Sequence, residues 1–143
     1  MQYALEVVIL PVRDADRALE FYRDRLGFNL DVDYAPSGAF RVVQLTPPGS
    51  GCSVQFGIGL TDAEPGSARR MHLVVRDVVA ARDELAGRGV EVGGVRHKAP
   101  PDTWVGGLAA GPDPERRDYA SFAEFADPDG NTWVLQERGH GAR

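Results

Sequence analysis

Histidine is the side chain in this sequence best suited to proton transfer near neutral pH, and the chain contains three of them. His72 lies in an apolar run, where an imidazole can act as an acid or base, contact a ligand, bind a metal ion, or form hydrogen bonds in or near the core. His97 and Lys98 open a long irregular stretch; they either reach a ligand there or remain solvated loop residues. His140 lies in the last residues of the chain, and we assign it no role.

Other polar residues have two interpretations each. The pair Arg116 and Arg117 could clamp a carboxylate or phosphate, or could only balance the acidic residues around it. Cys52 has no base beside it in the sequence, so we interpret it as a small packed residue. Asp14 and Asp77 each precede a helical pattern, and a helix N-cap explains them better than catalysis does.

Glycine and serine patterns exclude several common sites. Gly57-Ile58-Gly59 lacks the third glycine opening a helix that a dinucleotide-binding fingerprint requires. The sequence also has no glycine loop ending in Gly-Lys-Ser or Gly-Lys-Thr, and no serine nucleophile elbow.

Composition excludes two classes of partner. The formal net charge is −5, with 16 Lys and Arg against 21 Asp and Glu, and no basic block suggests nucleic acid. No apolar run approaches the roughly 20 residues that cross a bilayer, so no membrane partner is expected. A single cysteine rules out an internal disulfide framework, and we expect a cytoplasmic protein.

A sequence pattern that occurs twice indicates the elements that position these residues. Leu10–Asp14 and Leu73–Asp77 both contain Val-Arg-Asp, 63 positions apart, and each is followed by a helical pattern that stops at a glycine. Two copies are too few for a solenoid, and they favour a pseudo-symmetric domain whose halves together enclose a site.

The apolar periodicity predicts a strand, a helix and three strands in each half. In the first half the expected elements are strands at 4–12, 28–34, 40–46 and 52–58, with a helix from Asp14 to Gly27. In the second half they are strands at 71–75, 90–95, 119–126 and 132–137, with a helix from Val78 toward Gly87 and a hairpin turn at 127–131.

The segment 96–118 breaks this symmetry, because it carries glycines, prolines and Trp104 without a clear period. Loops of this length are often lids or binding loops, so we expect a flap with Trp104 or Tyr119 stacking on a ligand. The alternative is a surface or dimer-contact loop.

Several motifs together resemble the vicinal oxygen chelate (VOC) superfamily, which includes glyoxalase I, bleomycin-resistance proteins and extradiol dioxygenases. The motifs are Val7–Asp14, Ala18–Tyr22, Leu26–Phe28, His72–Val78, Gly89–Val92 and Phe125–Asn131. The resemblance covers almost the whole chain and is more specific for fold than for reaction.

The resemblance implies an α+β fold of two pseudo-symmetric βαβββ modules that form curled mixed sheets. We expect one VOC domain, with a first module at 1–62, a second at 63–138 that includes the long loop 96–118, and a tail at 139–143. Relatives of this size usually form homodimers.

In metal-dependent relatives, four strand positions supply histidine and glutamate ligands. Those positions correspond here to Val7, Gln55, Arg70 and Val134. Valine has no donor atom, arginine has no lone pair to give, and glutamine is a weak donor, so no metal and no cofactor are expected. His72 with the amide side chains of Gln55 and Gln136 would be a weak replacement set of metal ligands.

The function we expect is therefore metal-free binding of an apolar or aromatic small molecule in the sheet cavity. The expected ligand-binding residues are Val7, Ile9, Gln55, Arg70, His72, Trp104, Arg116, Tyr119, Val134 and Gln136. One alternative is a VOC enzyme, a lyase, isomerase or dioxygenase-like protein, possibly metal-free with His72 as its acid or base. Another is a structural or protein-interaction module with a vestigial pocket.

Overall fold

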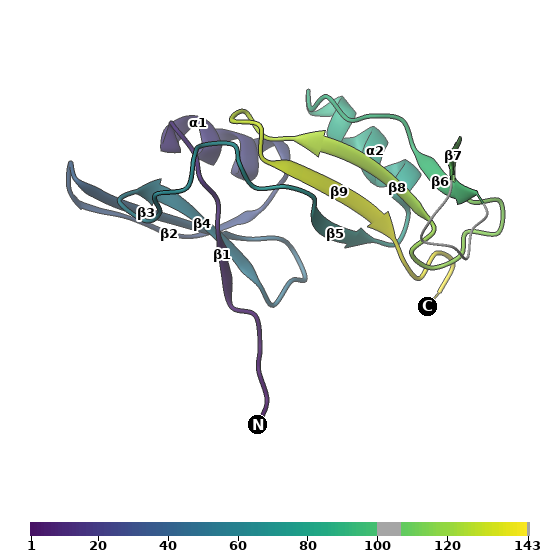
Figure 1. Ribbon diagram of the computed structural model, residues 1–143, viewed down its shortest axis with the longest axis horizontal. Coiled ribbons are helices and arrows are strands. Elements are labelled where there is room, and N and C mark those ends of the chain that lie inside the picture. Colours follow the sequence, from purple (N-terminus) through teal and green to yellow (C-terminus); the bar gives the residue numbers. More distant parts are fainter. Residues whose placement is uncertain (100–106, 143) are drawn as a thin grey trace. The chain divides into compact units, whose positions relative to one another are not determined.

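The computed structural model describes residues 1–99 and 107–142 (Figure 1). Contacts group the chain into two compact units, each with one β-sheet and helix, so the fold class is α+β. Unit 1 comprises Met1–Ala68 and Asp127–Asn131, and unit 2 comprises Arg69–Ala126 and Thr132–Arg143. Within the described residues, no helix is both long enough and apolar enough to cross a membrane.

Unit 1 contains a four-stranded sheet in the order β1-β4-β3-β2. Its strands are β1 (Val7–Ile9), β2 (Asn29–Ser37), β3 (Phe40–Thr46) and β4 (Ser53–Ile58). β1 pairs in parallel with β4, whereas the other neighbouring pairs are antiparallel. The first and last strands of the unit therefore lie side by side, and the helix and two strands form the connection that a parallel pair requires.

The helical segment of unit 1 begins directly after β1. Asp14 caps α1 (Ala15–Leu19), since its carboxylate accepts hydrogen bonds from the backbone N–H groups of Asp16 at 3.0 Å and Arg17 at 3.2 Å. This geometry confirms the predicted capping role. α1 continues as a π-helical segment, η1 (Glu20–Arg25). The ring of Tyr22, which is fully buried, lies 5.7 Å from that of Phe56 on β4 and joins helix to sheet.

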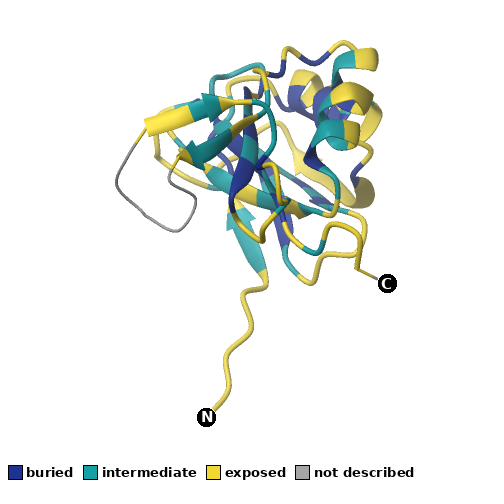
Figure 2. Ribbon diagram, turned by 90° about the vertical axis from the view of Figure 1, so that its right-hand side faces the viewer, coloured by how far each residue is buried: buried dark blue, intermediate teal, exposed yellow. Residues whose placement is uncertain are grey.

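The sheet of unit 1 has a buried face and an open face because side chains alternate along each strand. The buried side chains of β3 and β4 include Val43, Leu45, Val54 and Phe56. Their neighbours Val42, Gln44 and Gln55 are only half-buried, and every residue of β2 is exposed. Residues 1–6 are exposed throughout and extend away from the sheet (Figure 2).

The turn 127–131 completes the core of unit 1. Oδ1 of the buried Asp127 accepts backbone hydrogen bonds from Asp129, Gly130 and Asn131 at 2.9–3.0 Å. Its Oδ2 accepts from the Tyr22 hydroxyl at 2.7 Å and from the Asn131 side-chain amide at 2.8 Å. The same amide donates to the carbonyl of Pro11 at 3.0 Å, so the turn is bonded to both η1 and the end of β1.

Unit 2 contains a five-stranded sheet in the order β5-β9-β8-β6-β7. Its strands are β5 (Met71–Val75), β6 (Arg96–Ala99), β7 (Gly107–Ala110), β8 (Ser121–Ala126) and β9 (Thr132–Glu137). β5 and β9 pair in parallel, again joining the first and last strands of the unit, while β9, β8, β6 and β7 pair antiparallel.

Helix α2 (Val78–Gly87) covers one face of this sheet. Asp77 caps it by accepting the Ala80 N–H at 3.0 Å, as predicted. The alternate side chains of β8 and β9 on this face form the core of unit 2, where Phe125 and Trp133 stack with centroids 6.3 Å apart. The other face of the sheet is left open.

Three sequence predictions are wrong in detail. The strand expected at 4–12 is limited to Val7–Ile9, because only these residues pair with β4. The strand expected at 90–95 does not form; Val90 and Val92 are buried by packing and not by strand pairing. The segment 96–118 is not structureless, since it contains β6 and β7, and these give the second sheet an extra strand.

Candidate functional site

Three of the expected ligand-binding residues lie on the sheet of unit 1. Ile9 of β1 is the register partner of Gln55 of β4, and Val7 is the partner of Ser53. Gln55 donates a 2.7 Å hydrogen bond to Gln44, its cross-strand partner. Val7 and Gln55 are half-buried and Ile9 is 40% exposed. This face therefore combines apolar side chains with the amide pair and with the hydroxyls of Thr46 and Ser53, which lie 2.7 Å apart.

The open face of unit 2 carries most of the remaining candidates. We define it as the strand side chains on the side opposite to α2: His72, Val74, Arg96, Lys98, Phe122, Glu124, Val134 and Gln136. The register places Val134 beside both His72 and Glu124, and Gln136 beside both Val74 and Phe122. His72 and Val74 are exposed, so part of this face is accessible.

An ion pair crosses the open face of unit 2. Arg70, directly before β5, pairs through its guanidinium with the carboxylate of Glu124 on β8. Because β9 lies between β5 and β8, this bridge passes over β9. Val134 of β9, the register partner of Glu124, has an exposed fraction of only 1%.

The backbone of Arg70 holds an unusual conformation, with φ at +55° in the left-handed region. Two hydrogen bonds fix it. The Arg70 N–H donates to Thr132 Oγ1 at 2.7 Å, and the Arg70 carbonyl lies 2.8 Å from His72 Nδ1. Strained backbone of this kind persists where its surroundings hold it, and it concentrates at functional sites.

The contact between His72 and Arg70 also determines the tautomer of the imidazole. A carbonyl oxygen can only accept, so Nδ1 of His72 must carry the hydrogen that makes the 2.8 Å bond. In the neutral ring, Nε2 is then a bare acceptor on an exposed side chain. This is the form that can accept a proton from, or a hydrogen bond of, a bound molecule.

Gln136 and Tyr119 are joined by a hydrogen bond. The Gln136 amide donates to the Tyr119 carbonyl at 3.1 Å. Tyr119 is 42% exposed, and its hydroxyl accepts from Arg138 at 3.0 Å. Gln136 thus retains its amide oxygen on the open face beside an exposed aromatic ring.

Arg116 does not lie with these residues. It contacts Glu137, which faces α2 and is fully buried, with Nε–Oε2 at 2.9 Å and Nη2–Oε1 at 2.6 Å. It also reaches Asp77 at 3.2 Å. Burial raises the pKa of the Glu137 carboxyl. The hydrogen bonds from Arg116 and from the Val78 N–H lower it by more, so the pKa lies below its ordinary value. The neighbouring Arg117 pairs with Asp113 and Glu115, in keeping with the charge-balancing alternative.

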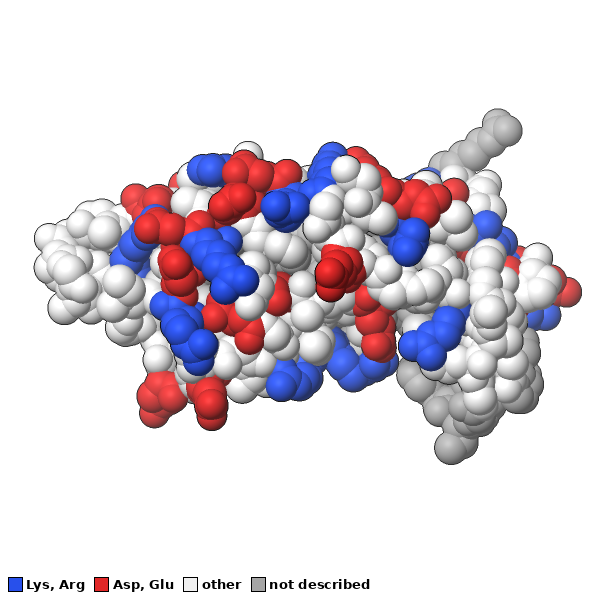
Figure 3. All heavy atoms as spheres, turned by 90° about the horizontal axis from the view of Figure 1, so that it is seen from above, with Lys and Arg blue, Asp and Glu red and all other residues white. Residues whose placement is uncertain are grey.

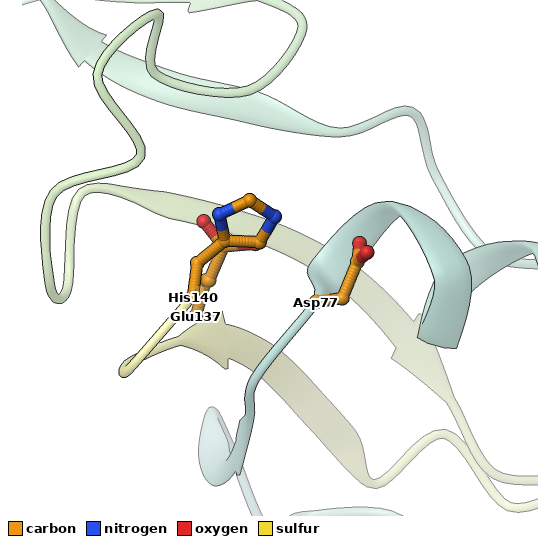
Figure 4. A group of neighbouring side chains, drawn as sticks. All are labelled: Asp77, Glu137 and His140. Atoms are coloured by element: carbon orange, nitrogen blue, oxygen red, sulfur yellow. The ribbon is translucent and has the colours of Figure 1, made fainter. Parts of the chain in front are cut away.

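The donor set does not fit the metal centre that metal-dependent relatives use. Val7 and Val134 offer no ligand atom, and Arg70 is a cation committed to Glu124. Within the described residues, Asp77, Glu137 and His140 form one group whose potential ligand atoms lie within 4.8 Å of one another (Figure 4). Both carboxylates of that group already pair with Arg116.

A separate hollow of about 350 Å³ lies beside β6. It is lined by His97, Lys98, Ala99, Asp113, Pro114, Glu115 and Arg117. The His97 Nδ1 already lies 2.8 Å from the Gly111 carbonyl, and Arg117 is neutralised by its two acidic neighbours. These contacts favour a structural role for the residues around the hollow.

Sequence reasoning missed Glu124, Phe122 and Arg96 on the open face. Alternation along Ser121–Ala126 puts Phe122 and Glu124 on one face of the strand, but only the pairing of β8 with β9 shows which face. Trp104, the expected capping residue, lies outside the described residues.

Comparison with known proteins agrees with the fold and the strand pattern. The sequence model of the glyoxalase/bleomycin resistance protein/dioxygenase superfamily matches residues 4–135, and the chain belongs to this superfamily. No curated protein matches the chain.

Solved structures of the same superfamily are similar over nearly the full length. A glyoxalase/bleomycin resistance protein from Streptomyces sp. CB03234 is 29% identical, with a TM-score of 0.68 over 94% of this chain and 100% of that chain. TnmS3, an antibiotic binding protein from the same organism, is 29% identical, with a TM-score of 0.71 over 95% of this chain and 96% of its own. A superfamily member from Sphaerobacter thermophilus DSM 20745 is 26% identical, with a TM-score of 0.71 over 96% and 98% of the two chains.

Proposed function

We propose that this protein binds an apolar or aromatic small molecule without a metal ion, in the manner of an antibiotic-sequestering protein. The observation that carries the proposal is the Arg70–Glu124 ion pair, whose Arg70 stands at one of the four positions that the family resemblance assigns to metal-binding residues. A guanidinium at that position has no lone pair to offer a metal ion, whereas its N–H groups can contact a bound small molecule directly. TnmS3, a structural relative at 29% identity, is described as an antibiotic binding protein, which supports the same class of function.

The residues on the open face of unit 2 have complementary tasks in this proposal. Val74 and Phe122 offer apolar surface, while His72 Nε2 and the Gln136 amide oxygen accept hydrogen bonds. Val7, Ile9 and Gln55 supply the same mixture of apolar surface and amide on unit 1. A few polar groups on an apolar surface orient a ligand, and the apolar contact provides most of the affinity.

We further propose that the protein acts as a homodimer in the cytoplasm. The family membership supports the dimer, and the single Cys52 supports a reducing compartment. Sedimentation equilibrium should give twice the chain mass; a monomer across micromolar concentrations would contradict the dimer.

Two measurements on the purified protein test the binding proposal. Elemental analysis should find no stoichiometric nickel, zinc, manganese or iron, and calorimetry should detect binding of naphthalene derivatives without added metal. About one tightly held ion per chain would overturn the proposal and favour a metal-dependent enzyme.

A second candidate function is a metal-free enzyme with His72 as its base. The bare Nε2 of His72 on an exposed side chain favours this alternative. If it is correct, His72→Gln abolishes turnover of a screened substrate, whereas the matched variant His97→Gln retains it. Binding that both variants preserve, with no turnover in the wild type, would contradict the enzyme.

A further inference from the structure

The open face of unit 2 carries information about the charge of the ligand. We propose that it selects aromatic ligands with an anionic oxygen group, and that this group replaces Glu124 as the partner of Arg70. The inference rests on the proposed function and specifies the chemical class of its ligand.

The ion pair joins two distant segments of unit 2. Arg70 and Glu124 are 54 positions apart in sequence, and they meet on the open face above β9. On the same face, Val74 of β5 is 53% exposed. A ligand group bonded to Arg70 therefore lies near an apolar surface that is already accessible.

Separating the ion pair costs little because both side chains are exposed. The side chains of Arg70 and Glu124 are 59% and 43% exposed, and ion pairs at such exposure contribute little to stability. A ligand carboxylate can form the same charge-assisted contacts with the guanidinium, while its ring gains contact with the exposed Val74. The exchange thus replaces a weak internal bond with an equivalent one plus apolar burial.

The backbone of Arg70 is held in one conformation. The hydrogen bonds to Thr132 and His72 hold the main chain at φ +55°, so the guanidinium can change partner without a backbone movement. Preorganisation of this kind lowers the conformational cost of binding.

The open face of unit 2 carries more positive than negative charge near the ion pair. Arg70 and Arg96 supply two cationic groups there, and Glu124 is the one carboxylate among the strand residues that define the face. The protein as a whole is acidic, at −5, and Figure 3 shows acidic and basic side chains interleaved over the surface it views. A local excess of positive charge favours an anionic ligand over a cationic one.

Calorimetric titration with matched probes tests the inference. The probes are 2-naphthoate and its neutral isostere 2-naphthamide, and the variants are Glu124→Gln, Arg70→Gln and their combination. In the wild type we expect tighter binding of the naphthoate. Glu124→Gln removes the internal competitor and should tighten naphthoate binding about three- to ten-fold, with little effect on the amide. Arg70→Gln should abolish the preference, and the double variant should not recover it.

Controls separate this inference from the proposed function. Glu84→Gln, on the exposed Glu84–Arg88 pair of α2, makes the same chemical change away from the site and should leave both affinities unchanged. Thermal melts establish that each variant is folded. If neither probe binds the wild type, the proposed function fails. Equal binding of both probes, or weaker naphthoate binding by Glu124→Gln, overturns the anionic selectivity alone.

Discussion

Arg116 is the residue on which the charged interior of unit 2 depends. It holds the fully buried carboxylate of Glu137 through two hydrogen bonds and also contacts Asp77 at the start of α2. Glu137 additionally accepts the Val78 N–H at 3.0 Å. One buried carboxylate thereby connects the end of β9, the first turn of α2 and the segment before β8.

Glu137→Gln should therefore destabilise the protein strongly. Loss of the negative charge leaves the guanidinium of Arg116 without its buried partner, at a cost of about 3 kcal/mol in the free energy of unfolding. Urea denaturation measures this change. The matched substitution Glu84→Gln breaks an exposed pair and should cost less than about 1 kcal/mol; equal costs for the two variants would refute a structural role for Glu137.

The same carboxylate makes stability depend on pH. The pKa of Glu137 is lower in the folded protein than its ordinary value, so its contribution is complete above the pKa of the unfolded chain. It is lost as the pH falls through the folded pKa. Asp77 acts in the same direction, because the Ala80 N–H lowers its pKa and the charge of Arg116 adds to this.

We therefore expect the unfolding free energy of the wild type to fall as the pH decreases below about 4. The decline should be shallower in Glu137→Gln, which has lost the titrating group. Urea titrations at several pH values compare the two slopes, and parallel slopes would exclude Glu137 as a contributor.

For single residues, the sequence predicts which face of a sheet a side chain occupies better than it predicts which residue that side chain contacts. Alternation along β5 and β9 is sufficient to place His72 and Gln136 on one side, and their roles there stay predictions. The pairing of Arg70 with Glu124 depends on strand register between distant segments, so no local pattern could indicate it. For the same reason, the sequence left two interpretations of Arg116 open.

At the scale of elements, Gly66 shows how closely the connecting segment packs. Its φ of +80° lies in the left-handed region, and a Cβ built on it would lie 2.0 Å from the Asp129 carbonyl oxygen in the turn 127–131. An L side chain at this position is strained and also collides with backbone that cannot move easily.

Gly66→Ala should consequently lower the unfolding free energy by at least about 2 kcal/mol. Gly87→Ala is the matched control, because Gly87 lies in α2 and a Cβ added there would meet no described atom beyond its own helix within 4 Å. Alanine there should stabilise by about 0.5–1 kcal/mol through helix propensity. Chemical denaturation measures the change in unfolding free energy of each variant, and we expect changes of opposite sign. If both variants are destabilised, loss of glycine, and not the collision at Gly66, explains the effect.

The elements that the sequence predicted accurately are those with a clear apolar period between turn residues. Phe40–Thr46, Met71–Val75 and Thr132–Glu137 have the expected bounds. β6 and β7 were missed because their short, polar or glycine-rich sequences carry no such period. β6 pairs with β8 and β7 pairs with β6, so both strands depend on tertiary contacts.

At the scale of the whole molecule, the last strand of each unit pairs in parallel with its first strand. In unit 2 the parallel partner of β5 is β9, the last strand in the chain. A chain truncated after Ala126 loses both β9 and the turn 127–131, so it should show no cooperative unfolding transition by circular dichroism. Truncation after Arg138 removes only the terminal residues and should retain the transition; cooperative unfolding of the shorter chain would contradict this dependence.

The turn 127–131 has a consequence for synthesis on the ribosome. Unit 1 contains the first 68 residues, yet its Tyr22 hydroxyl finds its acceptor only when Asp127 has emerged. The amino-terminal part of unit 1 therefore lacks this hydrogen bond until residues 127–131 have been translated. Chaperones that protect exposed apolar surface during this delay would find their substrate in unit 1.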